Sequence, residues 1–252
     1  MIRLFVSDVD GCLAEPYVPF NLEHFRVLRA LVGEGSLSGV PEMPPAFTLC
    51  TGRPLGYAEA VAQALGITEP FLFEAGAGMY YPTTGVRRWH PGFGTGAAEE
   101  VEDIQNWLEG LVQGTSLAVD RGKHTQAGVI GANEHEIQQA MEATARFIGH
   151  NHPRFVVAYT PISVDVMLGT LTKAQGLAWL AAELGISVAE MAFIGDTNGD
   201  LGAIKTVGSG FAPANGTPEV RQAAGTVTRG RVSAGVLEAV QACIERNRAS
   251  PN

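Results

Sequence analysis

The sequence predicts an α/β fold, a doubly wound parallel sheet whose core is interrupted by an inserted α+β domain. Three observations lead to this prediction: apolar runs of strand length first alternate with helical patterns, then give way to paired strands, and then the alternation returns. Strands that alternate with helices form parallel sheets, whereas strands joined by short turns pair antiparallel. The predicted boundaries are 1–82 for the first part of the core, 83–170 for the inserted domain and 171–252 for the second part of the core.

The first part of the core begins with a short apolar run from Ile2 to Ser7, which is typical of a buried strand. Asn21 can cap a helix that runs to about Val32, and a loop rich in glycine, proline and serine follows at 33–45. The same signals predict a strand at 46–50, a helix from Pro54 to Gly66 and a strand at 70–76.

The middle of the chain changes pattern, because strands now follow one another through hairpin-like joints. The predicted elements are a strand at 85–91, a helix at 97–112, strands at 116–121 and 126–131, a helix at 134–148, and strands at 154–159 and 163–168. This order is typical of an antiparallel sheet with helices on one face.

The alternating pattern returns at Lys173, which begins a helix that ends at Gly185. The last predicted strands lie at 191–196, 208–214 and 225–228, with helices between them.

The composition limits the classes of partner. The chain has 252 residues, 46% of them hydrophobic, and a net charge of −9, which makes it a poor candidate for binding nucleic acid or an anionic membrane. Its cysteines, Cys12, Cys50 and Cys243, are too few and too widely spaced for a disulfide framework. Asp8 and Asp10 interrupt the N-terminal apolar run, so no signal peptide or membrane span is expected. We expect a cytoplasmic protein without nucleic-acid or membrane partners, and the oligomeric state stays open.

Acidic side chains lie directly after two of the predicted core strands. Asp8 follows the first strand with Asp10 two positions on, and Asp196 ends the strand at 191–196. Because ligands of parallel sheets bind at the carboxyl ends of the strands, we expect these carboxylates to lie close together. Carboxylates that meet repel one another unless a cation lies among them, and Mg²⁺ prefers carboxylate, water and phosphate oxygens. The pattern therefore predicts a Mg²⁺ site.

The same edge offers groups that would bind a phosphate ester. Thr51 supplies a hydroxyl, the helix after Pro54 presents its positive N-terminal end, and Lys173 supplies a point charge. With an ordinary pKa of about 4, Asp8 is ionised at neutral pH and could attack phosphorus to form an aspartyl-phosphate. Asp10 could protonate the leaving oxygen and later accept a proton from the hydrolytic water. Positioning and charge neutralisation supply most of the catalysis in phosphoryl transfer.

Each motif also has a simpler interpretation when it is taken alone. A pair such as Asp8 and Asp10 is common in loops and helix caps, 51–53 could be only a turn, and Lys173 could be a solvated helix residue. The segment GDTNGD at 195–200 could be an Asx-turn or a fragment of a calcium loop. The catalytic interpretation depends on their order, because each motif falls at a predicted strand end or helix start.

Taken together, the motifs resemble those of the haloacid dehalogenase superfamily of phosphatases. The matching stretches are DVDGCL at 8–13, TGR at 51–53, Lys173 in TKAQGL, GDTNGD at 195–200, and a similar C-terminal stretch at 213–228. The insert lies where the Cof-like subfamily IIB carries its C2-type cap. This resemblance spans essentially the whole chain and implies a Rossmann-like core with an α+β cap. It extends to archaeal-type phosphoglycolate phosphatases and to sugar-phosphate phosphatases.

The resemblance also implies roles at the metal site. Asp8 would be the nucleophile and a metal ligand, and Asp10 would be the acid/base and bind the metal through its backbone carbonyl. Asp196 would be a further metal ligand, with Asp200 as a second acidic group that supports the site. Lys173 would contact the phosphate beside Asp8.

The second motif would hold the substrate. Thr51 and Gly52 would bind the phosphate, and Arg53 would reach toward the substrate or the cap. The chain departs from the family pattern at Gly199, where the family usually has asparagine, and Asn198 stands one position earlier. Whether Asn198 takes over that role stays open.

The predicted cap carries Arg121 and Lys123 in the hairpin-like turn at 120–125. Either cation could pair with a substrate carboxylate, as phosphoglycolate would need, although cations in such turns are often only solvated. The sequence thus predicts a Mg²⁺-dependent phosphatase for a small phosphorylated metabolite, either phosphoglycolate-like or a sugar phosphate. The alternatives are a phosphomutase for sugar phosphates and a non-enzymatic phospho-aspartate module, which would need no leaving-group acid such as Asp10.

Overall fold

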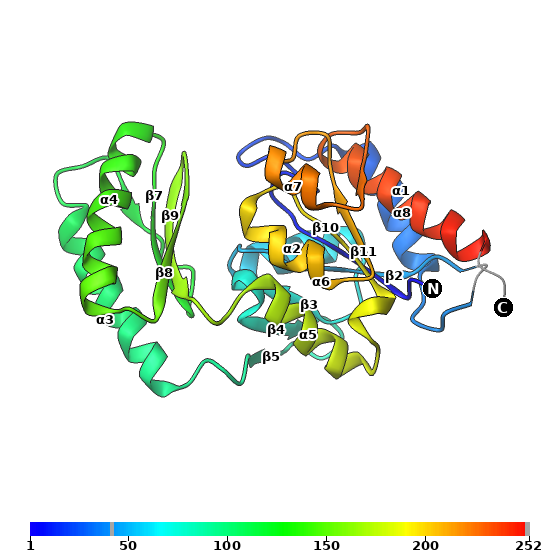
Figure 1. Ribbon diagram of the computed structural model, residues 1–252, viewed down its shortest axis with the longest axis horizontal. Coiled ribbons are helices and arrows are strands. Elements are labelled where there is room, and N and C mark those ends of the chain that lie inside the picture. Colours follow the sequence, from blue (N-terminus) through cyan, green and yellow to red (C-terminus); the bar gives the residue numbers. More distant parts are fainter. Residues whose placement is uncertain (41–42, 250–252) are drawn as a thin grey trace. The chain divides into compact units, whose positions relative to one another are not determined.

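The structure is a computed structural model that describes residues 1–40 and 43–249. Contacts between residues divide the chain into two compact units. The first unit combines Met1–Arg88 with the segment that begins at Thr172, and the second unit is Trp89–Leu171 (Figure 1). The loop predicted at 33–45 includes 41–42, which lie outside the described residues.

The first unit is an α/β core. Up to the point where the chain leaves it, its elements are β1 (Leu4–Ser7), α1 (Leu22–Glu34), β2 (Ala46–Leu49), α2 (Leu55–Leu65), β3 (Phe71–Phe73), the 3₁₀ helix η1 (Glu74–Gly76), β4 (Gly78–Tyr81) and β5 (Val86–Trp89). After the chain returns they are α5 (Lys173–Leu184), η2 (Val188–Glu190), β10 (Met191–Ile194), η3 (Asn198–Asp200), α6 (Leu201–Thr206), β11 (Ser209–Ala212), α7 (Pro218–Ala223), β12 (Thr226–Val227) and α8 (Val232–Ala249).

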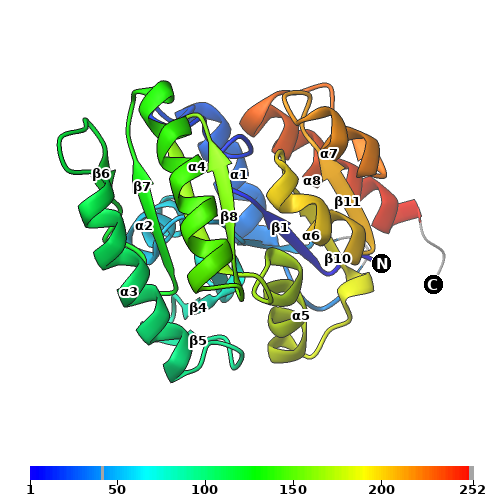
Figure 2. The same cartoon turned by 60° about the vertical axis from the view of Figure 1, so that its left-hand side comes forward.

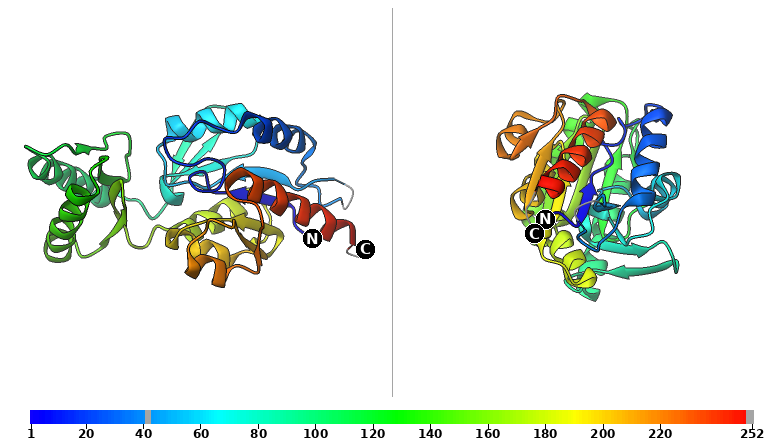
Figure 3. Two further views of the ribbon diagram at one scale, coloured as in Figure 1. Left: turned by 90° about the horizontal axis from the view of Figure 1, so that it is seen from above. Right: turned by 90° about the vertical axis from the view of Figure 1, so that its right-hand side faces the viewer.

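A five-stranded parallel sheet in the order β12-β11-β10-β1-β2 forms the centre of this unit. Helices cover both faces: α1 and α2 lie on one side of the strands, and α5, α6 and α7 lie on the other (Figure 3). All of β1 is buried, with Leu4 and Val6 in the core cluster that includes Leu177 of α5, while the ring of Phe5 stacks on that of Phe47. This continuous burial explains the unbroken apolar run and confirms the predicted doubly wound sheet.

The third predicted strand does not join this ladder as a full strand. A single parallel bridge joins Cys50 to Leu72, and β3 instead pairs antiparallel with β4 in a small sheet of order β3-β4-β5. Pro70 has no N–H to donate to a ladder, and its carbonyl accepts a 2.7 Å hydrogen bond from the Thr48 hydroxyl. The strand at 85–91, counted with the insert in the sequence analysis, is β5 of this small sheet.

The second unit is the predicted α+β insert. Its elements are α3 (Thr95–Leu111), β6 (Ala118–Val119), β7 (Gln126–Ile130), α4 (Glu134–Asn151), β8 (Phe155–Thr160) and β9 (Ser163–Leu168). The strands form an antiparallel sheet in the order β6-β7-β9-β8, and α3 and α4 cover one face (Figure 2). Alternate residues of β9 are buried, as expected for a sheet covered on one side only.

Within residues 1–40 and 43–249, no helix combines the length and the apolar character that crossing a membrane requires.

Candidate active site at the carboxyl edge of the parallel sheet

Asp8 follows β1 directly, and its side chain is buried. Its Oδ1 accepts a 2.7 Å hydrogen bond from the Val9 backbone N–H, and its Oδ2 lies 2.8 Å from Lys173 Nζ. Burial raises the pKa of Asp8 to about 8, against the lowering effect of Lys173. Asp200 and Asp196 raise this pKa further. The ordinary pKa assumed from the sequence is therefore wrong here, and ionised Asp8 needs more nearby positive charge than Lys173 supplies.

Lys173 is the first residue of α5, and its Nζ lies between two carboxylates, 2.6 Å from Asp200 Oδ1 and 2.8 Å from Asp8 Oδ2. Burial acts to lower the pKa of Lys173, but Asp200 and Asp8 outweigh it and hold this pKa well above its usual range. The start of α5 lies close to η1, where Gly76 has a φ of 92° and a Cβ would lie 2.9 Å from the Cα of Gly176. A close glycine contact thus helps to place Lys173.

The loop after β10 carries Asp196 and is held by Asp200, whose side chain is fully buried. Asp200 Oδ2 accepts hydrogen bonds of 3.0 Å from the backbone N–H groups of Asp196 and Thr197. Asp196 itself is not satisfied in this way, because its buried Oδ1 has no hydrogen-bond partner among the described residues. Burial, followed by the charge of Asp200, raises the pKa of Asp196 to about 7.

These three aspartates fit a divalent cation. Each of Asp8, Asp196 and Asp200 offers one oxygen, and the three oxygens lie within 4.8 Å of one another. Three carboxylates face one ammonium group, that of Lys173, so the cluster is short of positive charge. A buried acceptor without a partner is costly, and the Asp196 Oδ1 would regain a partner on a cation.

The chain turns sharply at Gly11, which keeps Asp10 near this cluster. Gly11 has a φ of 72°, and a Cβ there would lie 1.9 Å from Asp196 Oδ2, so any other residue would be strained and would displace the Asp196 carboxylate. Asn215 holds the turn from outside: its Nδ2 donates to the Gly11 carbonyl at 2.8 Å, and its Oδ1 accepts from the Val232 N–H at 2.8 Å. Asn215 was not among the predicted site residues, and its only signal was its place in the stretch 213–228.

The second motif lies in the loop after β2. Arg53 does not extend into open space, because its Nε and Nη2 donate to the two oxygens of Asp10 at 2.6 and 2.7 Å. Thr51 is fully buried, and its hydroxyl oxygen accepts a 3.1 Å hydrogen bond from the Arg53 backbone N–H. Gly52 lies between them, and a Cβ added there would meet no described atom within 4 Å.

Asn198 is exposed, and its Oδ1 accepts a 3.2 Å hydrogen bond from the Thr217 hydroxyl at the start of α7. The Asn198 side chain is therefore used to join η3 to α7. Gly199, next to it, is exposed as well.

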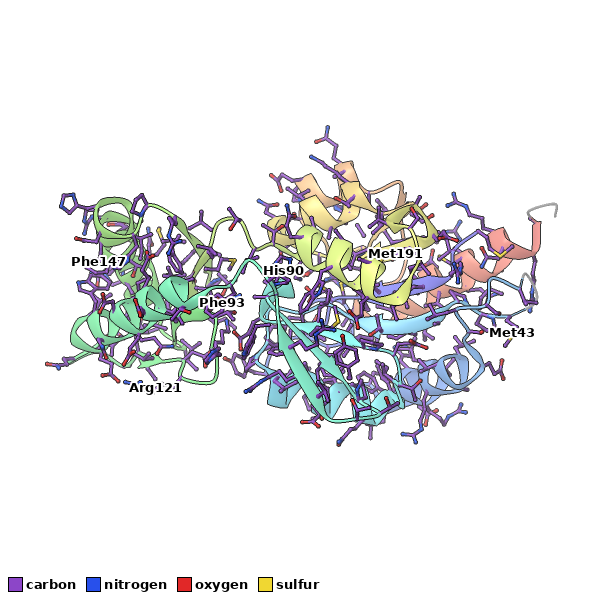
Figure 4. All side chains as sticks on the ribbon, turned by 90° about the horizontal axis from the view of Figure 1, so that it is seen from below. Met43, His90, Phe93, Arg121, Phe147 and Met191 are labelled. Carbon is purple, nitrogen blue, oxygen red and sulfur yellow. The ribbon has the colours of Figure 1, made fainter. Side chains whose placement is uncertain are left out.

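Both predicted cap cations already have partners within the second unit. Arg121 forms an ion pair with Glu109, and Figure 4 shows Arg121 on this unit. Lys123 is nearly buried, with Nζ 2.5 Å from Asp165 Oδ1 and 3.9 Å from Asp120 Oδ2. Their contact with a substrate stays a prediction.

Comparison with known proteins finds a family model, a relative and solved structures that each match more than half of this chain. The model of a family described as haloacid dehalogenase-like hydrolase matches residues 94–240. A phosphoglycolate phosphatase of Archaeoglobus fulgidus is 37% identical over 246 residues, which cover 95% of this chain and 96% of that protein. A solved Thermoplasma acidophilum structure has a TM-score of 0.75 at 20% identity and covers 97% of this chain and 99% of its own. The sucrose-phosphatase of Synechocystis has a TM-score of 0.65 at 18% identity, with coverage of 97% and 99%.

Proposed function

The chain belongs to the haloacid dehalogenase-like hydrolases and is a phosphatase, and we propose that it uses Mg²⁺ to hydrolyse a small phosphorylated metabolite through an aspartyl-phosphate on Asp8. One observation carries the proposal. Carboxylates from the ends of β1 and β10 meet within 4.8 Å, beside a buried lysine and with one carboxylate oxygen left without a partner. Buried polar atoms without a hydrogen-bond partner are uncommon, and a bound cation would give this oxygen the partner that it lacks.

The proposed reaction has two steps. A carboxylate oxygen of Asp8 forms a bond to phosphorus as the ester bond breaks, and Asp10 gives a proton to the leaving oxygen. Water then attacks phosphorus, Asp10 takes its proton, and phosphate leaves Asp8. Thr51 accepts from the Arg53 N–H and keeps its own hydroxyl proton to donate to a phosphate oxygen, and Lys173 neutralises charge beside Asp8.

Asp8 and Asp196 would hold the Mg²⁺, together with the backbone carbonyl of Asp10. Asp200 would support the site, because both of its oxygens already accept hydrogen bonds from the protein. The bound cation would supply positive charge to the carboxylates and to the substrate phosphate.

For the substrate we propose phosphoglycolate or a similar phosphorylated small acid, with sugar phosphates as the competing class. The support is the relative named phosphoglycolate phosphatase at 37% identity, and Arg121 and Lys123 are the cap cations proposed to contact the carboxylate. With Mg²⁺ present, we expect phosphoglycolate to give a higher kcat/KM than any hexose phosphate in a panel assayed for released phosphate.

A hexose phosphate with the highest kcat/KM would contradict the proposed substrate class but not the phosphatase. A sugar 1-phosphate converted to its 6-phosphate without free phosphate would identify a phosphomutase. A stable aspartyl-phosphate after treatment with acetyl phosphate would favour the non-enzymatic module.

Mg²⁺ is expected to stabilise the chain more at high pH than at low pH. The pKa values of Asp8 and Asp196 are about 8 and about 7 in the folded chain, above the ordinary 3.8. Groups with raised pKa values contribute stability that is present below the ordinary pKa and is lost as pH rises through the folded pKa. Mg²⁺ competes with these protons, so the rise in Tm that it causes should be about twofold larger at pH 8.5 than at pH 5.5, measured by thermal unfolding.

The comparison variant is Asp196→Asn, which removes one of the two carboxyl groups whose pKa values are raised. This variant should show a smaller Mg²⁺-induced rise in Tm and a weaker dependence of that rise on pH. An equal rise at both pH values in the unchanged chain would exclude these carboxyls as the cation site. Adding a chelator should return the Tm to its metal-free value.

A further inference from the structure

Arg53 contacts two tyrosine rings as well as the carboxylate of Asp10. Its guanidinium carbon lies 4.8 Å from the centre of the Tyr57 ring and 5.8 Å from the centre of the Tyr17 ring. The Nε and Nη2 edge forms the two-pronged contact with Asp10. Two aromatic rings and one carboxylate therefore surround a single guanidinium group and limit its movement.

Asp10 depends on this arrangement for its orientation. Among the described residues, Arg53 supplies the only side-chain hydrogen bonds to Asp10. A two-pronged contact keeps carboxylate and guanidinium in one plane, so whatever fixes the plane of Arg53 also fixes that of Asp10. Each carboxylate oxygen can accept a second hydrogen bond, which leaves a position for a leaving oxygen or a water.

The two tyrosines differ in how firmly they are placed. Tyr57 lies in the first turns of α2 and is partly buried. Tyr17 is 73% exposed and has a φ of 61°, an uncommon conformation for a bulky side chain. Tyr57 is thus the firmer contact of Arg53, because it is shorter and comes from a helix, whereas Tyr17 is exposed to solvent.

We propose that Tyr57 is a positioning residue, which together with Tyr17 holds Arg53 in place so that Arg53 orients the Asp10 carboxylate toward the leaving oxygen. The inference rests on the proposed function, in which Asp10 protonates that oxygen. Nothing in it requires Tyr57 to touch the substrate.

The test compares two esters that differ in their need for a proton. Phenolate is a poor leaving group, whereas 4-nitrophenolate leaves without protonation, and kcat/KM reports the step in which the ester bond breaks. Tyr57→Leu should lower kcat/KM for phenyl phosphate about tenfold more than for 4-nitrophenyl phosphate. Tyr57→Phe keeps the ring and should therefore give the same ratio of kcat/KM values for the two esters as the unchanged chain.

The matched control is Tyr81→Leu, because the Tyr81 hydroxyl also contacts an arginine, Arg88, at 3.0 Å. This variant should leave the ratio between the esters unchanged. Arg53→Lys keeps the positive charge but loses the two-pronged contact with Asp10, and it should give the same selective loss. This second variant tests the inference if thermal unfolding shows that Tyr57→Leu is not folded. Equal losses for both esters in Tyr57→Leu and Arg53→Lys would overturn the inference alone. An unchanged chain that cleaves neither these esters nor phosphoglycolate with Mg²⁺ would overturn the proposed function, and this inference with it.

Discussion

Asp8→Asn is expected to abolish phosphate release, with kcat lower by about 10⁴-fold or more at every pH. The amide of asparagine is no nucleophile toward phosphorus, and it offers a weaker cation ligand than the carboxylate that it replaces. At the same time the variant should be at least as stable as the unchanged chain in metal-free buffer at pH 8.5. Burial raises the pKa of Asp8 to about 8 because the charged form is unfavourable there, and the substitution removes that charge.

The assay is phosphate release from 4-nitrophenyl phosphate with Mg²⁺, and stability is measured by thermal unfolding. Asp103→Asn is a matched control, because it makes the same chemical change away from the cluster. Asp103 lies at an exposed position of α3. Undiminished turnover by Asp8→Asn would remove the aspartyl-phosphate mechanism. Lost activity with a much lower Tm would show instead that Asp8 serves the fold.

The parts of this site that the sequence predicted are those fixed by strand topology. Asp8 and Asp196 are 188 positions apart, yet β1 and β10 are neighbours in a parallel sheet, so their carboxyl ends must meet. Lys173 was predicted because it begins a helix after the insert, and its Nζ lies against both Asp8 and Asp200. Periodicity and motif order were sufficient to expect that these side chains lie close together, and their roles stay a prediction.

The parts that the sequence did not predict depend on side-chain pairing without a local pattern. The bond from Asn215 to the Gly11 carbonyl spans 204 positions and leaves no periodic signal. The contact of Arg53 with Asp10 also has no local pattern, since an arginine in a loop can extend toward solvent or fold back. The direction of this side chain depends on the ring that packs beside it. The raised pKa of Asp8 also depends on packing, because burial is its largest cause.

Lys173→Met is expected to destabilise the metal-free chain and to lower kcat about 10³-fold. Removing one partner of a buried ion pair leaves a buried charge without compensation, which typically lowers the free energy of unfolding by about 3–5 kcal/mol. The loss should be larger at pH 9 than at pH 6, because a neutral Asp8 carboxyl needs no cation and burial already raises its pKa to about 8. Urea unfolding at both pH values measures the change in free energy, and phosphate release with Mg²⁺ measures kcat.

A second substitution separates the two roles of the lysine. Lys173 Nζ lies 2.6 Å from Asp200 Oδ1, so Lys173→Met combined with Asp200→Asn removes both partners of this pair. The double variant should recover part of the lost free energy of unfolding at pH 9, because one uncompensated carboxylate is gone, and residues in contact are not additive. Activity should not recover, since no ammonium group remains beside Asp8. Recovery of activity together with stability would mean that Lys173 acts only by holding Asp200. A double variant that is no more stable than Lys173→Met would show that Asp200 does not carry the charge that the lysine compensates.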